Sequence, residues 1–112
     1  MASFATVADI ETLLGFKFTS ASSPTEAQVA DLINRHSASL SILLKARGVA
    51  EPAQGTDAYE YCKLIVTYAV AADVLRRRAL EEDRDVSQMA MELDRKVQEL
   101  KQVLADAPQA FA

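Results

Sequence analysis

The chain has 112 residues, of which half are hydrophobic and a quarter are charged, a composition typical of one soluble globular domain. Its net charge of -4 has the wrong sign for a protein that neutralises many nucleic-acid phosphates, so we expect no tight grip on DNA. One cysteine and one histidine exclude an internal disulfide and a Cys/His zinc site within one chain, and residues 64–72, the longest nearly uncharged stretch, are too few to span a membrane.

The first predicted helix follows Thr6, whose hydroxyl can cap it, while Asp9 favours the positive end of the helix dipole. The apolar residues at positions 7, 10, 13 and 14 share one side, and Gly15 ends the helix after about two turns. Residues 16–23 then form a loop, and we expect its two aromatic residues to pin it to the core.

The second predicted helix has the clearest start signal of the chain. Ser23 is expected to be the N-cap, Pro24 the first helical residue, and Glu26 the partner that completes a capping box. The helix is expected to end near Gly48. Its apolar stripe repeats every three or four residues and consists of Val29, Leu32, Ile33, His36, Leu40, Leu43 and Leu44.

A third helix is predicted after a turn-rich connection at residues 49–56, with Thr56 or Asp57 as its cap. Its two apolar stripes are Tyr61, Cys62, Ile65, Ala69 and Ala72, and Tyr59, Val66, Val70 and Val74. A helix with two apolar faces needs two partners. Two interpretations stay open: the helix runs through the middle of its own bundle, or one face contacts another copy of the chain.

The fourth predicted helix follows an acidic break at residues 81–85, with Asp85 as its cap and Gln88 as the capping partner. Its stripe consists of Val86, Met89, Ala90, Leu93, Val97, Leu100 and Leu104. The predicted fold class is therefore all-α, a small helical bundle of three long helices and one short N-terminal helix. Residues 1–105 are predicted to form one domain, and residues 106–112 a flexible or partner-docking tail.

No sequence motif predicts catalysis. Glycine-rich phosphate loops, nucleophile elbows and metal-binding helix pairs do not occur in the sequence. His36 falls within an apolar stripe, which favours a packed or interface histidine over a general base, and Cys62 is interpreted as a small buried hydrophobe. We therefore expect no enzyme activity, no cofactor and no metal.

Two segments have an alternative, functional interpretation. Arg76, Arg77 and Arg78 are interpreted as a solvated helix end or as an intersubunit clamp. In a closed ring, the clamp would meet the neighbour's acidic residues Glu81, Glu82 and Asp83. The tail, with Pro108 and an exposed Phe111, is either a frayed terminus or a short peptide that docks on a partner.

The segment Phe4-Ala-Thr-Val-Ala-Asp-Ile-Glu-Thr-Leu-Leu-Gly15, followed by a Ser/Thr-capped helix rich in Glu, Ala and Gln, resembles the head-tail connector (adaptor) proteins of tailed bacteriophages. The likeness continues more loosely through Tyr61-Cys-Lys-Leu-Ile-Val66. The resemblance implies a helical bundle that forms a homo-oligomeric ring, typically of twelve copies, between the portal protein and the tail or stopper proteins.

Such a ring keeps the DNA channel continuous, and DNA passes through its lumen without specific binding. The implied location is the neck of the virion at the head-tail junction, with the host cytoplasm during assembly, and no membrane partner. The first residues carry no basic segment before an apolar run, so we expect no export. The alternative is a small helical adaptor or regulator that binds a host or phage protein.

Overall fold

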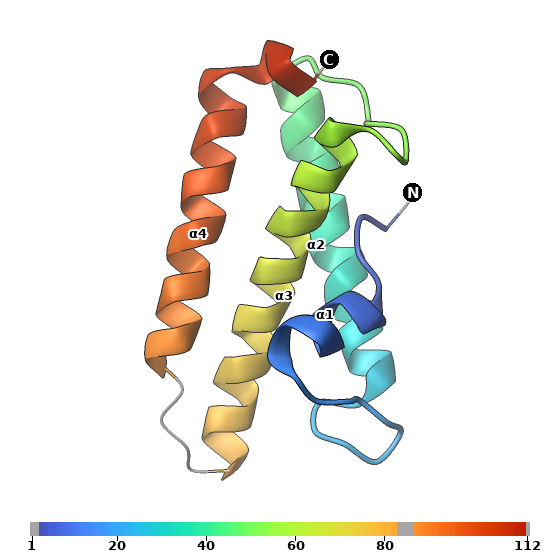
Figure 1. Ribbon diagram of the computed structural model, residues 1–112, viewed down its shortest axis with the longest axis vertical. Helices are drawn as coiled ribbons and strands as arrows, with labels where there is room; N and C mark the ends of the chain where they lie inside the picture. The colour runs from blue at the N-terminus through green and yellow to red at the C-terminus, as the bar shows by residue number, and fades with distance from the viewer. Residues whose placement is uncertain (1–2, 83–86, 112) are drawn as a thin grey trace.

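The computed structural model describes residues 3–82 and 87–111, without the side chains of residues 80–82 and 87. It contains four α-helices, α1 (Val7–Leu14), α2 (Glu26–Ala46), α3 (Asp57–Glu82) and α4 (Ser87–Asp106), and a 3₁₀ turn, η1 (Pro108–Phe111). The described residues include no strand, so the predicted all-α class is confirmed. The long helices α2, α3 and α4 run along an elongated body of 43 × 26 × 20 Å (Figure 1).

Helix α1 begins and ends where the sequence predicts. The Thr6 amide donates to the Asp9 carboxylate at 2.8 Å, and the Asp9 amide donates to the Thr6 hydroxyl at 3.3 Å, which completes a capping box. Gly15 takes a left-handed conformation with φ of 79°, and its amide donates to the Glu11 carbonyl. In the loop that follows, Phe18 is buried and Phe16 is half-buried against the same core, so both aromatic residues hold the loop there, as predicted.

The start of α2 differs from the prediction. The N-cap is Thr25, and its box partner is Gln28: the Thr25 amide donates to the Gln28 side chain at 2.9 Å, and the Gln28 amide donates to the Thr25 hydroxyl at 3.2 Å. The prediction of Ser23 as the cap with Glu26 as its partner is therefore wrong. The loop before α2 folds back on itself instead, because the Glu26 amide donates to the Thr19 carbonyl at 3.0 Å.

Helix α3 is the centre of the bundle, with α1, α2 and α4 all packed against it (Figure 1). Thr56 caps it, since the Tyr59 amide donates to the Thr56 hydroxyl at 3.2 Å. Its buried apolar residues come from both predicted stripes, namely Tyr59, Cys62, Ile65, Val66, Ala69, Val70, Ala72 and Val74. The chain therefore covers both faces by itself, which confirms the first of the two interpretations of this helix.

Helix α4 packs on α3 through a narrower stripe than predicted. Ala90, Val97 and Leu104 are buried, but Met89 is 56% exposed, so its assignment to the buried stripe is wrong. Val86 and the proposed cap Asp85 lie outside the described residues. Within the described ranges, no helix is both long enough and apolar enough to cross a membrane.

Candidate interaction surface

Cys62, the sole cysteine, occupies a structural position in the core. Its side chain is fully buried, and this burial, with a smaller contribution from the charge of Glu51, raises the pKa of the thiol to about 11. The thiol is therefore neutral at physiological pH, as the interpretation as a small hydrophobe requires. The part of the chain that the structure describes contains no group of three or more His, Cys, Asp or Glu residues that could hold a metal ion.

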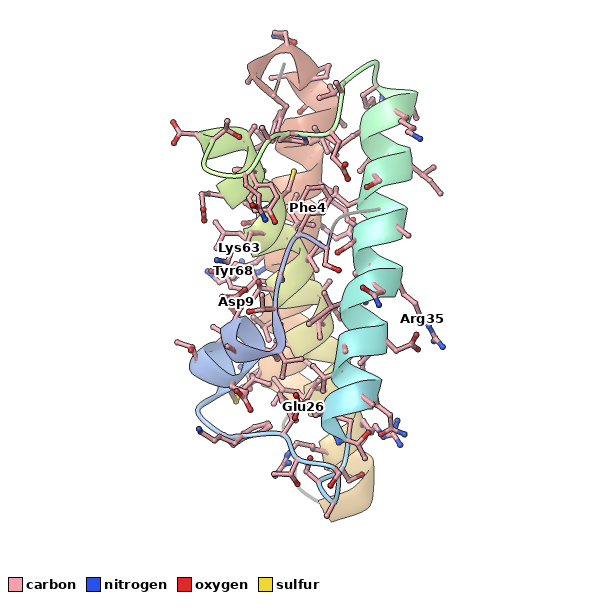
Figure 2. The ribbon with its side chains drawn as sticks, turned by 90° about the vertical axis from the view of Figure 1, so that its right-hand side faces the viewer. Phe4, Asp9, Glu26, Arg35, Lys63 and Tyr68 are labelled. Atoms are coloured by element: carbon pink, nitrogen blue, oxygen red, sulfur yellow. The ribbon has the colours of Figure 1, made fainter. Side chains whose placement is uncertain are left out.

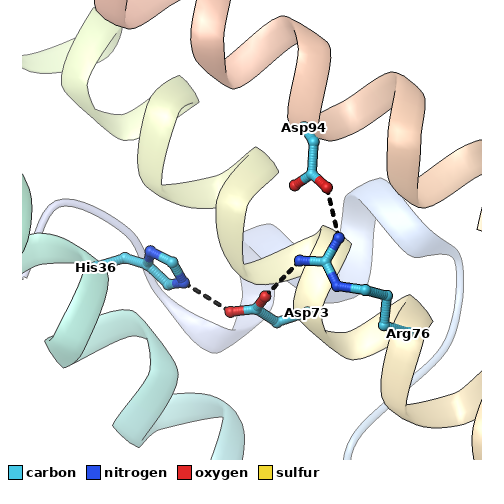
Figure 3. Close-up of polar contacts among 4 residues, drawn as sticks. All are labelled: His36, Asp73, Arg76 and Asp94. Carbon is cyan, nitrogen blue, oxygen red and sulfur yellow. Dashed lines mark hydrogen bonds and ion pairs between the residues drawn. The ribbon is translucent and has the colours of Figure 1, made fainter.

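His36 belongs to a chain of polar contacts that joins three helices (Figure 3). Its Nε2 atom lies 2.7 Å from Oδ2 of Asp73, and Oδ1 of Asp73 accepts a hydrogen bond of 2.7 Å from Arg76. Arg76 also donates to Asp94 at 2.5 Å, so the contacts run from α2 through α3 to α4. We call these four residues the polar network. The sequence predicts His36 at a packed position, but it does not predict its carboxylate partner.

The contacts of the polar network favour the charged forms of Asp73 and Arg76. The hydrogen bond from His36, opposed by burial and aided by Arg76, lowers the pKa of Asp73 below its usual value. The carboxylates of Asp94 and Asp73, in that order, raise the pKa of Arg76. Asp73 therefore stays ionised at neutral pH, and Arg76, which donates to both Asp73 and Asp94, holds the side of α4 that bears Asp94 toward α2.

The three consecutive arginines point in different directions. Arg76 lies in the polar network, and the guanidinium of Arg78 lies 4.1 Å from the ring centroid of Phe16 and donates to the Ser23 carbonyl at 3.4 Å. Arg77 is exposed and lines a shallow depression beside α2. Arg76 is thus not merely solvated, because it links helices inside the chain.

The acidic partners of the predicted clamp are Glu81, Glu82 and Asp83. The side chains of Glu81 and Glu82, and all of Asp83, lie outside the described residues. The intersubunit role of the arginine run stays a prediction, and Arg76 and Arg78 could fulfil it only by exchanging the contacts given above.

The C-terminal segment is packed, not free. Residues Pro108–Phe111 form η1, and the Phe111 side chain is buried against Tyr61, with ring centroids 5.1 Å apart in an edge-to-face arrangement. The expectation of an exposed Phe111 is wrong, because the turn at η1 returns the chain onto α3 and the apolar ring gains burial there. A docking role for Pro108 and Phe111 stays a prediction, and it would require Phe111 to leave this site.

A shallow apolar groove lies between α1 and α3. Leu13 from α1 and Leu64 and Tyr68 from α3 form its apolar part, and Asp9, Glu60 and Lys63 lie on its rim. Lys63 and Asp9 form an ion pair across the two helices at 3.4 Å. Figure 2 shows Asp9, Lys63 and Tyr68 on the α1 side of the body, away from Arg35 on α2.

The exposed edge of α4 carries two further apolar side chains, Met89 and Val103. Met89 and Val103 lie two heptads apart, so they share one edge of the helix beside the buried stripe. Asp94 lies on the other edge, which the polar network turns toward α2. The edge with Met89 and Val103 therefore faces the side of α3 that carries Leu64 and Tyr68.

We name Leu13, Leu64, Tyr68, Met89 and Val103 the groove face. Its four large aliphatic members are between 41% and 56% exposed, and only Ile42 and Met91 of the other described residues are comparably exposed large hydrophobics. Single exposed apolar residues are ordinary, but a cluster on one face marks a binding surface. Sequence reasoning missed this face, although Leu64 and Val103 fall outside every predicted stripe and so carried a signal.

In comparisons with known proteins, no protein-family model, no curated protein and no solved structure matches the chain.

Proposed function

We propose that this protein is a non-catalytic structural subunit, a head-tail connector (adaptor) of a tailed bacteriophage. Copies of it form a ring between the portal protein and the tail or stopper proteins and keep the DNA channel continuous. The observation that carries the proposal is the groove face, an apolar surface left open on a bundle whose core is otherwise complete. The resemblance of residues 4–15 to connector proteins is the reason for proposing this ring as the assembly in which the surface takes part.

The completeness of the core supports an assembling protein over a partly folded one. Both stripes of α3 are covered within the chain, and Phe111 closes the end of the bundle against Tyr61. The exposed leucines, methionine and valine of the groove face are therefore not needed to build the fold. Exposed apolar area on one face costs solubility unless a partner covers it, which favours a function in binding.

Charge supports the proposed place in the virion. The net charge of -4 suits the wall of a channel through which DNA passes without specific binding. In this proposal the protein resides in the neck of the virion and reaches it from the host cytoplasm, where the neck assembles. It acts by its shape and surface alone, and requires no cofactor.

The test is electron microscopy of the purified protein mixed with the portal protein of the same virus. We expect a ring of this protein seated on one end of the portal. Absence of both ring and complex would contradict the proposal. A stable monomer or dimer bound to a different soluble protein would support the alternative, a small helical adaptor or regulator.

A further inference from the structure

We infer that the occupant of the groove face is the outer surface of α2 from a second copy of this chain, centred on Ile42. The inference rests on the proposed function, because it specifies how the subunits of the ring contact one another. It names both sides of the contact: a protruding isoleucine on one copy and the apolar groove of Leu13, Leu64 and Tyr68 on the next.

Ile42 has the form of a knob. It is 67% exposed on the outer side of α2, which makes it one of the two most exposed large hydrophobics among the described residues. Ala38 and Ala46 lie four residues before and after it, on the same line of the helix. Two small neighbours on that line let another protein surface approach the helix closely around the isoleucine.

The groove is a shallow depression with a mostly apolar lining. Leu13 and Leu64 are half-exposed on its walls, and Thr12 and Thr67 add short side chains to its lining. A branched aliphatic side chain would be desolvated between them, and the removal of its apolar area from water stabilises the contact. Isoleucine brings no polar atom that the groove would leave unpaired.

The groove rim carries one net negative charge from Asp9, Glu60 and Lys63, and the charged residue nearest the knob along α2 is the basic Lys45. Lys45 lies three residues after Ile42, and Arg47 caps the exposed C-terminal end of α2, so the knob has basic groups beside it. On the rim of the groove, Lys63 is paired with Asp9, and Glu60 is exposed. Lys45 of one copy can therefore lie beside Glu60 of the next, which favours this register over its reverse.

The two surfaces lie on opposite sides of the body, as Figure 2 shows for Arg35 on α2 and Tyr68 on the groove side. A contact between different surfaces is heterologous: each copy keeps one free knob and one free groove after it binds a neighbour. Repetition of such a contact produces a ring if the rotation closes. A two-fold dimer through the groove face alone would instead leave Ile42 exposed.

The experiment is oxidative cross-linking of the double variant I42C/L64C over a series of protein concentrations. We expect a ladder of covalent species beyond the dimer, because every copy offers both partners of the disulfide. Each single variant alone should give little product, and a mixture of the two should stop at the dimer. The native Cys62 is fully buried and should stay unreactive.

The matched control is M91C/L64C, because Met91 is 69% exposed but lies on the outward side of α4. Cross-linking of I42C/L64C no stronger than that of this control would overturn the inference. Efficient dimer formation by L64C alone would also overturn it, because that result indicates a two-fold contact between groove faces.

A charge exchange tests the register. We expect Lys45→Glu and Glu60→Lys each to reduce the ladder about three- to tenfold, and the combined variant to restore it. Failure of the combined variant to recover would contradict the assigned register. The experiment distinguishes this inference from the proposed function. If the protein binds the portal but forms no ladder, only this inference is contradicted. If it forms the ladder but does not bind the portal, only the connector role is contradicted.

Discussion

The two edges of the contact between α3 and α4 differ, because polar contacts close one of them and the other is open. On the α2 side, Arg76 joins Asp94 of α4 to Asp73 and, through it, to His36 of α2, so charged groups hold three helices together. On the α1 side, Leu64, Met89 and Val103 remain exposed. The first edge therefore belongs to the fold, and the second is available for a partner. Variants on the two edges should separate stability from assembly.

The largest expected effect contrasts two neighbouring residues of α4. Leu104 is fully buried, whereas Val103 is 49% exposed. Leu104→Ala should lower the free energy of unfolding by about 2–5 kcal/mol through lost burial and a cavity, and Val103→Ala by less than about 0.5 kcal/mol. Chemical denaturation measures both. Similar losses for the two variants would show that the edge with Val103 is not open.

The next effect concerns the closed edge. Arg76→Met removes the donor to two carboxylates, and we expect it to lower the free energy of unfolding by about 1–2 kcal/mol, because Arg76 is partly exposed and its pairs are screened by solvent. The control is Arg95→Met, which breaks an exposed pair with Glu92 within one helix and should cost less than about 0.5 kcal/mol. Equal losses of unfolding free energy in the two variants would show that the polar network has no special role in stability.

The same edge should respond to acid. The pKa of Asp73 is lowered in the folded state, so the unfolded chain binds more protons in the acidic range, and the stabilisation is present above the unfolded value of about 3.9. That stabilisation is lost as the pH falls through the folded pKa. Asp73→Asn should therefore flatten the decline of the urea midpoint below about pH 4. An unchanged slope would contradict the assignment.

The smallest effect on stability is expected at the open edge, where the effect on assembly should be greatest. Leu64→Asp should change the free energy of unfolding by less than about 1 kcal/mol, because Leu64 is 42% exposed, yet it places a charge in the groove. Sedimentation velocity measures the association of the variant, and chemical denaturation of the same preparation measures its free energy of unfolding. A large loss of stability with unchanged association would reverse the interpretation of the two edges.

The helices could be predicted from the sequence because their signals are local. Thr6, Asp9 and Gly15 define α1 through contacts within a few residues, and the structure has them as expected. The start of α2 is harder to predict from the sequence, because residues 23–28 contain two overlapping capping boxes. A choice between Ser23 and Thr25 depends on how the preceding loop folds, including the bond from Glu26 back to Thr19.

The contacts that define the two edges could not be predicted in the same way. Arg76 and Asp94 are eighteen residues apart, and their pairing depends on the register between two helices. The sequence predicts Phe111 as part of an exposed tail, but tertiary packing against Tyr61 buries it. The groove face likewise required the packing of α1 and α4 around α3, which places residues from three helices on one side.

The central claim is that the groove face is the assembly surface. Its most direct test is electron microscopy of portal mixed with the wild-type protein, with Leu64→Asp and with Met91→Asp, which carries the same charge on the outward side of α4. The account predicts rings with the wild type and with Met91→Asp, and none with a folded Leu64→Asp variant. Rings of Leu64→Asp as complete as those of the wild type would contradict it.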